Sequence, residues 1–189
     1  CKVLENDKLS LATSEIVLKT ASSSIGHFAR VASSTEVEFL QNFYYPLALK
    51  LIVDSRSDGH RYAGAIILTQ PANSSPALIY SKRKVLFNVI WDAVCDKNKT
   101  VRQAAATTLE ASLQVISQRE AMSDYIRSAL KQIDLGFGSS VAEKVLGSLT
   151  ILDTLLGGAV VSYADLNNTL RQQGVAVQDL VWKVLQRKD

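Results

Sequence analysis

The sequence predicts an all-α protein in which pairs of helices stack into a repeating α-α superhelix. Only 3 prolines and 9 glycines interrupt the 189 residues, which is few for a β protein that turns after about ten residues. Apolar residues recur with helical spacing along most of the chain, and one short pattern returns at a nearly constant interval. Because 47% of the residues are hydrophobic, the chain can also bury a substantial core.

The first predicted core helix carries a proline. Apolar residues keep helical spacing from Val37 to Leu51. Ser33 with Glu36 offers a capping box at its start. We expect the helix to bend or restart near Pro46, because proline lacks a backbone donor and clashes with the preceding turn.

Two long helices are predicted in the middle of the chain. One begins near Pro76, with Ser75 as its N-cap, and is expected to stop near Asp96. Asp96 or Asn98 can cap the next helix, whose apolar core face covers 101–116.

The remaining helices are separated by glycines. Their apolar faces cover 126–133, 141–156 and 177–185. Gly136 and Gly138 mark a turn, and Gly157 with Gly158 is expected to close a helix in the left-handed conformation. Ser162 can cap one more helix, which brings the prediction to about nine helices.

A basic residue followed three positions later by a small one forms the repeating pattern. The basic residues are separated by 42, 41 and 42 residues, at Lys19, Arg61, Arg102 and Lys144. The small residues are Ser22, Gly64, Ala105 and Gly147. A small side chain is needed once per repeat where stacked helices approach closely.

The interval between these positions defines the predicted class of repeat. HEAT and armadillo units have periods of about 40–47 residues. We therefore predict one HEAT/armadillo-type solenoid segment of about four helix pairs. Its repeats are placed roughly at 1–32, 33–71, 74–119, 121–158 and 160–189.

Two acidic residues precede the central basic positions. Asp54 and Asp96 come seven and six residues before Arg61 and Arg102. This spacing predicts a ladder of acidic and basic side chains along the array. The alternative is that these residues are N-caps and solvated charges.

The sequence indicates no chemistry of its own. His27 and His60 lie in helical patterns without catalytic partners, and Cys1 and Cys95 are far apart, so we predict no catalytic residue, cofactor or metal site. The basic run 82–84 is too short to indicate nucleic-acid binding. No segment is continuously apolar enough to predict a transmembrane helix.

Several sequence blocks, in this order, resemble the N-terminal HEAT-repeat region of the target of rapamycin (TOR) kinases, in the phosphatidylinositol-kinase-related family. The likeness covers roughly 11–156, and its blocks are 36–39, 59–68, 89–94, 101–106, 117–120, 135–137 and 147–152. One departure is Gln70-Pro71, where the family's helix usually continues for about another turn. We therefore expect the helix that begins near Arg61 to end early.

The resemblance implies a scaffold within a longer serine/threonine kinase. ATP and magnesium would bind a kinase domain outside this segment. The implied partners are a raptor-type subunit, other TOR-complex subunits (TORC1) and neighbouring HEAT repeats, in nutrient and growth signalling. The implied location is cytoplasmic and, within the parent complex, peripheral to endomembranes. The alternatives are a HEAT scaffold of another class, such as an importin-like receptor or a phosphatase scaffold, and a small helical enzyme.

Overall fold

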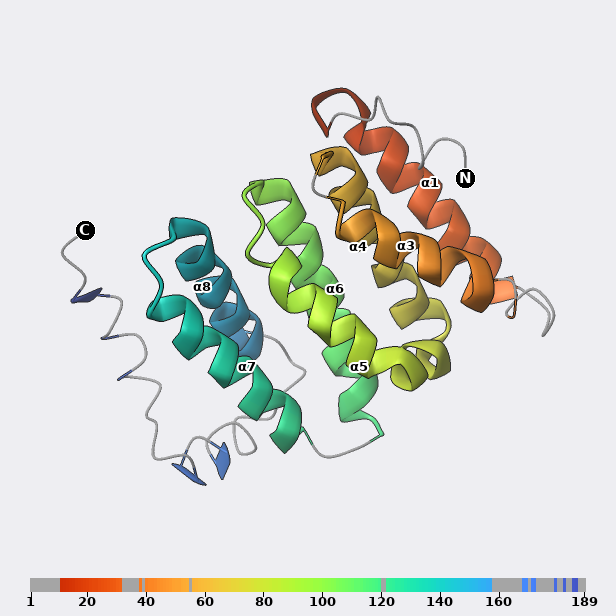
Figure 1. The fold of residues 1–189 in the computed structure, drawn as a ribbon. Helices are drawn as coiled ribbons and strands as arrows, with labels where there is room; N and C mark the ends of the chain where they lie inside the picture. Colours follow the sequence, from red (N-terminus) through yellow and green to blue (C-terminus); the bar gives the residue numbers. More distant parts are fainter. Residues whose placement is uncertain are drawn as a thin grey trace. The chain divides into compact units, whose positions relative to one another are not determined.

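The structure is a computed structural model that describes residues 11–31, 38, 40–54, 56–119 and 122–157, and a few positions from 168 to 186. Over these residues it contains seven α-helices, one π-helical turn and no strand (Figure 1). The predicted all-α helical-repeat fold is therefore confirmed. The predicted caps Ser33, Glu36 and Ser162, the glycine Gly158 and the core face 177–185 lie outside the continuously described ranges.

The chain forms two compact units, Cys1–Val115 and Ile116–Asp189. The helical elements, in chain order, are α1 (Leu11–Val31), η1 (Leu40–Tyr44), α3 (Tyr45–Ile52), α4 (Asp58–Ser74), α5 (Pro76–Ala93), α6 (Lys99–Ser117), α7 (Ser123–Phe137) and α8 (Ala142–Gly157).

Helix α4 is at the centre of the first unit. It packs against both α1 and α3, and it continues through a short turn into α5 (Figure 1). Tyr62, Ile67 and Leu68 are almost completely buried. Across the unit, the Tyr45 hydroxyl of α3 donates a hydrogen bond to the Lys82 carbonyl of α5 (3.3 Å). Because of this central position, α4 contributes side chains to each site described below.

Pro46 and Pro71, which lie in α3 and α4, behave differently. A π-helical turn ends at Tyr44, and α3 then starts with Pro46 in its first turn, which confirms the predicted restart. The prediction that the next helix ends at Gln70-Pro71 is wrong, because α4 continues to Ser74. Pro71 cannot donate to the carbonyl four residues earlier, but the helix continues for one more turn and closes with the Ser75 amide donating to the Pro71 carbonyl (2.8 Å).

Three helix starts show which capping predictions were satisfied. Ser57, which the sequence did not indicate, caps α4 by accepting a hydrogen bond from the His60 amide (3.2 Å). Asn98 precedes α6 and accepts from the Thr100 amide (2.9 Å). Ser75 occupies the predicted N-cap position of α5, but its side chain makes no capping hydrogen bond.

The contrast between the two serines gives a matched test of capping. Ser57→Ala is expected to lower the free energy of unfolding by about 1 kcal/mol, because it leaves a first-turn amide without its acceptor. Ser75→Ala is the control and is expected to change the stability by no more than about 0.5 kcal/mol. Urea unfolding of both variants measures the difference. Equal losses would contradict the assignment of Ser57 as the functional cap.

In the second unit, α7 packs against α8. The predicted turn at Gly136 is wrong, because α7 includes Gly136 and ends at Phe137, with Gly138 at the C-cap. Gly136 instead serves close packing: a Cβ there would lie 2.7 Å from the Lys144 carbonyl and would also meet the Ser148 hydroxyl of α8. A small residue was therefore required by the neighbouring helix and not by the turn.

Candidate functional site

Arg61 and Asp96 form a buried ion pair in the first unit. Both side chains are more than nine-tenths buried, and the Arg61 Nε and Nη2 atoms lie 2.5 and 3.2 Å from the two Asp96 carboxylate oxygens. Arg61 Nη1 also donates to the Asp54 carbonyl (3.0 Å). Arg61 therefore joins the turn before its own helix to the turn before α6.

Arg102 repeats part of this arrangement one repeat later. Its Nη1 donates to the carbonyls of Asp96 (2.7 Å) and Lys97 (3.1 Å). Asp96 consequently contacts two arginines, through its carboxylate to Arg61 and through its carbonyl to Arg102. Its carboxylate also accepts from the Asn98 amide (2.7 Å). We call Asp54, Arg61, Asp96 and Arg102 the ladder.

The two outer basic positions do not join the ladder. Lys19 lies in the middle of α1, is exposed and pairs with Glu15 one turn earlier (2.7 Å). Lys144 is exposed near the start of α8. An interhelical turn shortly before the basic residue supplies the carbonyls that Arg61 and Arg102 bind, and Lys19 has no such turn within reach.

The small residues of the repeating pattern are buried at all four positions. The Ser22 hydroxyl donates to the Ile66 carbonyl (2.9 Å), which joins α1 to α4. A Cβ on Gly64 would lie 2.7 Å from the Ala48 carbonyl and would meet the Ile52 amide of α3. Ala105 is fully buried, and Gly147 lies on the buried face of α8. Gly64 thus sets how closely α4 approaches α3.

His60 belongs to the same region, although the sequence gave it no role. It is buried, and its Nδ1 atom lies 2.9 Å from the Asp54 carboxylate. Arg56 also binds this carboxylate, through its backbone amide (2.9 Å) and its side chain. The hydrogen bond from the Arg56 side chain, followed by that from His60, lowers the pKa of Asp54 below its ordinary value.

The lowered pKa of Asp54 predicts a pH-dependent contribution to stability. Because the folded-state pKa lies below the unfolded one, this contribution is complete above about pH 4 and is lost as the pH falls toward the folded-state pKa. Asp54→Asn is therefore expected to lower the urea midpoint at pH 7, and the difference from wild type should shrink below about pH 4. Asp124→Asn, at an exposed carboxylate, is the control. A difference that stayed constant to pH 3 would contradict this role of Asp54.

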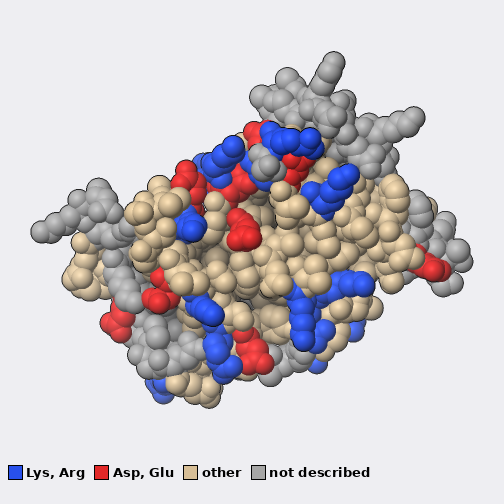
Figure 2. Space-filling model, in the orientation of Figure 1, with Lys and Arg blue, Asp and Glu red and all other residues tan. Residues whose placement is uncertain are grey.

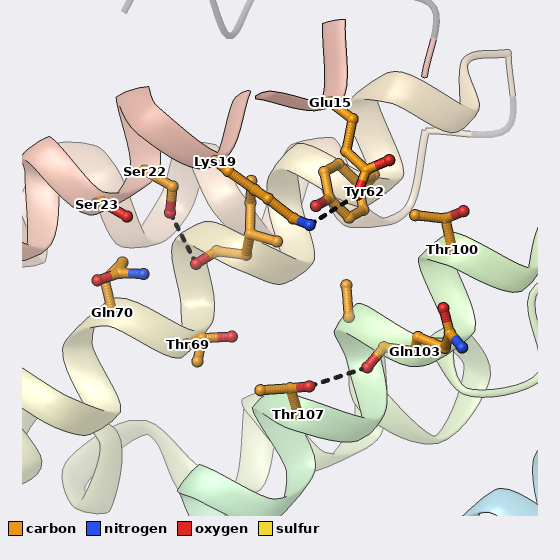
Figure 3. Close-up of a pocket in the computed structure, with 12 residues that line it drawn as sticks. Glu15, Lys19, Ser22, Ser23, Tyr62, Thr69, Gln70, Thr100, Gln103 and Thr107 are labelled. Carbon is orange, nitrogen blue, oxygen red and sulfur yellow. Dashed lines mark hydrogen bonds and ion pairs between the residues drawn. The ribbon is translucent and has the colours of Figure 1, made fainter. Parts of the chain in front are cut away.

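A groove of about 380 Å³ lies between side chains of α1, α4 and α6. Figure 3 shows Lys19 and Glu15 beside Tyr62, with Gln103 and Thr107 contributed by α6. We call this cavity the inner groove. It is lined by Glu15, Lys19, Ser22, Ser23, Tyr62, Ile66, Thr69, Gln70, Thr100, Gln103, Ala104 and Thr107.

Residues that line the inner groove occupy equivalent positions in successive repeats. Tyr62 and Gln103 each follow the basic residue of their repeat by one position, and Ile66 and Thr107 follow it by five. Residues at equal offsets in stacked repeats lie on the same face of successive helices. The basic and small positions of the repeating pattern do not by themselves indicate this face.

Charge is dispersed over the surface. The basic residues Lys82 and Lys84 in the middle of α5 are exposed, whereas Arg83 stacks on Tyr80, with 4.2 Å between the guanidinium carbon and the ring centroid. On the face shown in Figure 2, lysines and arginines lie among aspartates and glutamates, separated by wide uncharged areas. This face does not present one continuous basic stripe among its described residues.

The part of the chain that the structure describes offers neither a metal site nor a membrane-spanning helix. No group of three or more histidine, cysteine, aspartate or glutamate residues there could hold a metal ion. None of the described helices combines the length and apolar character needed to cross a membrane.

The packed helix pairs and the contacts between successive repeats define an all-α helical-repeat protein. No protein-family model matches the chain. It is 31% identical over 127 residues to the serine/threonine-protein kinase tor1 of Schizosaccharomyces pombe, which covers 66% of this chain and 5% of that relative. It is 27% identical over 104 residues to the serine/threonine-protein kinase mTor of Drosophila melanogaster, covering 55% and 4%.

These similarities confirm the resemblance to the TOR kinases. The chain is related to a segment of the TOR serine/threonine kinases. It spans only about one-twentieth of the length of the curated relatives that it matches.

Proposed function

We propose that this chain is a non-catalytic HEAT-type scaffold segment of a TOR serine/threonine kinase. The observation that carries the proposal is the similarity to two TOR kinases along a chain built of packed helix pairs. Helical-repeat arrays present extended surfaces, which suit large and shallow protein contacts. The reaction, with its ATP and magnesium, belongs in this proposal to a kinase domain elsewhere in the parent protein.

The proposed role is complex assembly in nutrient and growth signalling, with a raptor-type subunit as the principal partner. The parent would act in the cytoplasm, with peripheral association with endomembranes. The ladder supports a scaffold role because Arg61 and Asp96 connect successive repeats through buried contacts. A scaffold must hold its repeats in a fixed register so that a distant partner surface keeps its shape.

Association of the full-length parent with its raptor-type subunit tests this proposal. The tagged parent kinase should retain the subunit in affinity purification. Arg61→Ala within the parent should reduce the amount retained, whereas Arg127→Ala should not, because Arg127 forms only an exposed pair with Asp124. A parent that never retains a raptor-type subunit would contradict the partner assignment. ATP turnover by the purified 189-residue chain would contradict its non-catalytic role.

A further inference from the structure

The inner groove contains a buried hydroxyl group that contacts only a surface ion pair. Tyr62 is 2% exposed, and its hydroxyl oxygen makes no well-aligned hydrogen bond among the described residues, but it interacts with the Lys19 ammonium and the Glu15 carboxylate. A buried polar group without a well-aligned partner is costly, and folded proteins contain few of them. The hydroxyl lies beside the Glu15–Lys19 pair at the groove (Figure 3), and both residues of that pair are substantially exposed. Movement of this exposed pair would open the hydroxyl to a ligand.

The chemistry of the groove lining is neutral and able to both donate and accept hydrogen bonds. Its two charges, on Glu15 and Lys19, neutralise each other in an ion pair (2.7 Å). The carboxamides of Gln70 and Gln103 can each donate and accept, as can the hydroxyls of Ser23, Thr100 and Thr107. Phosphate and nucleic acid would need unpaired cations, which this lining does not offer.

A polypeptide main chain has the complementary chemistry. Its amide and carbonyl groups alternate as donors and acceptors, and it carries no charge. The apolar side chains of Ile66 and Ala104 provide contact surface for the side chains of such a segment. The groove receives residues from three helices, α1, α4 and α6, so that a bound segment would cross successive repeats.

We propose that the inner groove binds an extended, uncharged polypeptide segment of a partner protein through its main chain, with the Tyr62 hydroxyl donating to one of its carbonyls. This inference rests on the proposed scaffold role and assigns to it a surface and a ligand chemistry. Thr107, at the exposed edge of the groove, limits the space for the segment. The Glu15–Lys19 pair must move aside for Tyr62 to bind.

The test uses the complete 189-residue chain as bait for a displayed library of random 12-residue peptides. Thr107→Lys is the blocking variant, because a long side chain would occupy the groove. Thr150→Lys is the matched control: Thr150 also donates its hydroxyl to the carbonyl four residues earlier, as Thr107 does, but it lies in α8 and does not line the groove. Peptides enriched by wild type should bind Thr150→Lys equally and Thr107→Lys at least tenfold more weakly.

Tyr62→Phe separates binding from folding. Loss of the hydroxyl should weaken the selected peptides about three- to tenfold. The thermal midpoint should change little, since the intramolecular contacts of the hydroxyl are with the exposed Glu15–Lys19 pair. Equal binding to Thr107→Lys, or no enriched peptide at all, would overturn the groove assignment. The assay contains no raptor-type subunit, so that its failure is distinct from failure of the association experiment above.

Discussion

Arg61→Ala is expected to lower the free energy of unfolding of the first unit by about 3–5 kcal/mol. The substitution removes the cation from a buried pair and leaves the Asp96 carboxylate with only the Asn98 amide. It also removes the donor to the Asp54 carbonyl. Because the Asp96 carboxylate is buried, water cannot solvate it once its cation is gone. The loss of stability therefore exceeds that from breaking an exposed pair, whose remaining charge is solvated.

Urea unfolding can follow the first unit through Trp91, which lies on α5 and is 9% exposed. Trp182→Phe would remove the other tryptophan, which is exposed. Arg127→Ala, at an arginine in an exposed ion pair of the second unit, is the control; followed by far-ultraviolet circular dichroism, it should cost no more than about 1 kcal/mol.

A double-mutant cycle distinguishes the ion pair from simple loss of packing. Arg61→Ala and Asp96→Ala should together cost less than the sum of the single changes, because the second removes the charge that the first leaves unpaired. Additive losses, or a loss from Arg61→Ala no larger than that from Arg127→Ala, would contradict the importance of the buried pair. If Arg61→Ala does not fold, Arg61→Lys keeps the charge and should show an intermediate loss.

The sequence could predict only the local part of the ladder, because the Arg61–Asp96 ion pair joins residues 35 positions apart. An acidic residue in a turn and an arginine six or seven positions later recur with the repeat, and in the structure Arg61 lies between Asp54 and Asp96. The same recurrence could not show that Lys19 and Lys144 remain exposed. For Lys19 the difference is where the helix begins, because Lys19 lies eight residues inside α1. Lys144 follows the start of α8 closely, as Arg61 and Arg102 follow theirs, but no acidic residue stands in the turn before it.

The inner groove could not be predicted as a site because its residues differ in type between repeats. Tyr62 and Gln103 occupy equivalent positions, yet one is an aromatic hydroxyl and the other a carboxamide. The burial of the Tyr62 hydroxyl without a well-aligned hydrogen bond depends on three helices together, and no local pattern encodes it.

Gly64→Ala is expected to destabilise the first unit by about 1–3 kcal/mol, which is opposite in sign to the usual effect of this change in a helix. Alanine normally favours a helix over glycine by about 1 kcal/mol. At Gly64, however, the new methyl group would meet the Ile52 amide and the Ala48 carbonyl, and both are backbone atoms of α3 that cannot rotate away. The two helices must separate, so packing loss outweighs the gain in helix propensity.

Gly157→Ala supplies the matched control, because no atom of the described residues lies within 4 Å of a Cβ at that helical position. It should leave the stability unchanged or raise it by up to about 1 kcal/mol. Gly136→Ala should resemble Gly64→Ala, since its Cβ would lie 2.7 Å from the Lys144 carbonyl. Urea midpoints for the three variants would separate the two effects. If Gly64→Ala were as stable as Gly157→Ala, close backbone approach could not be the reason that a small residue occurs at this position of the repeat.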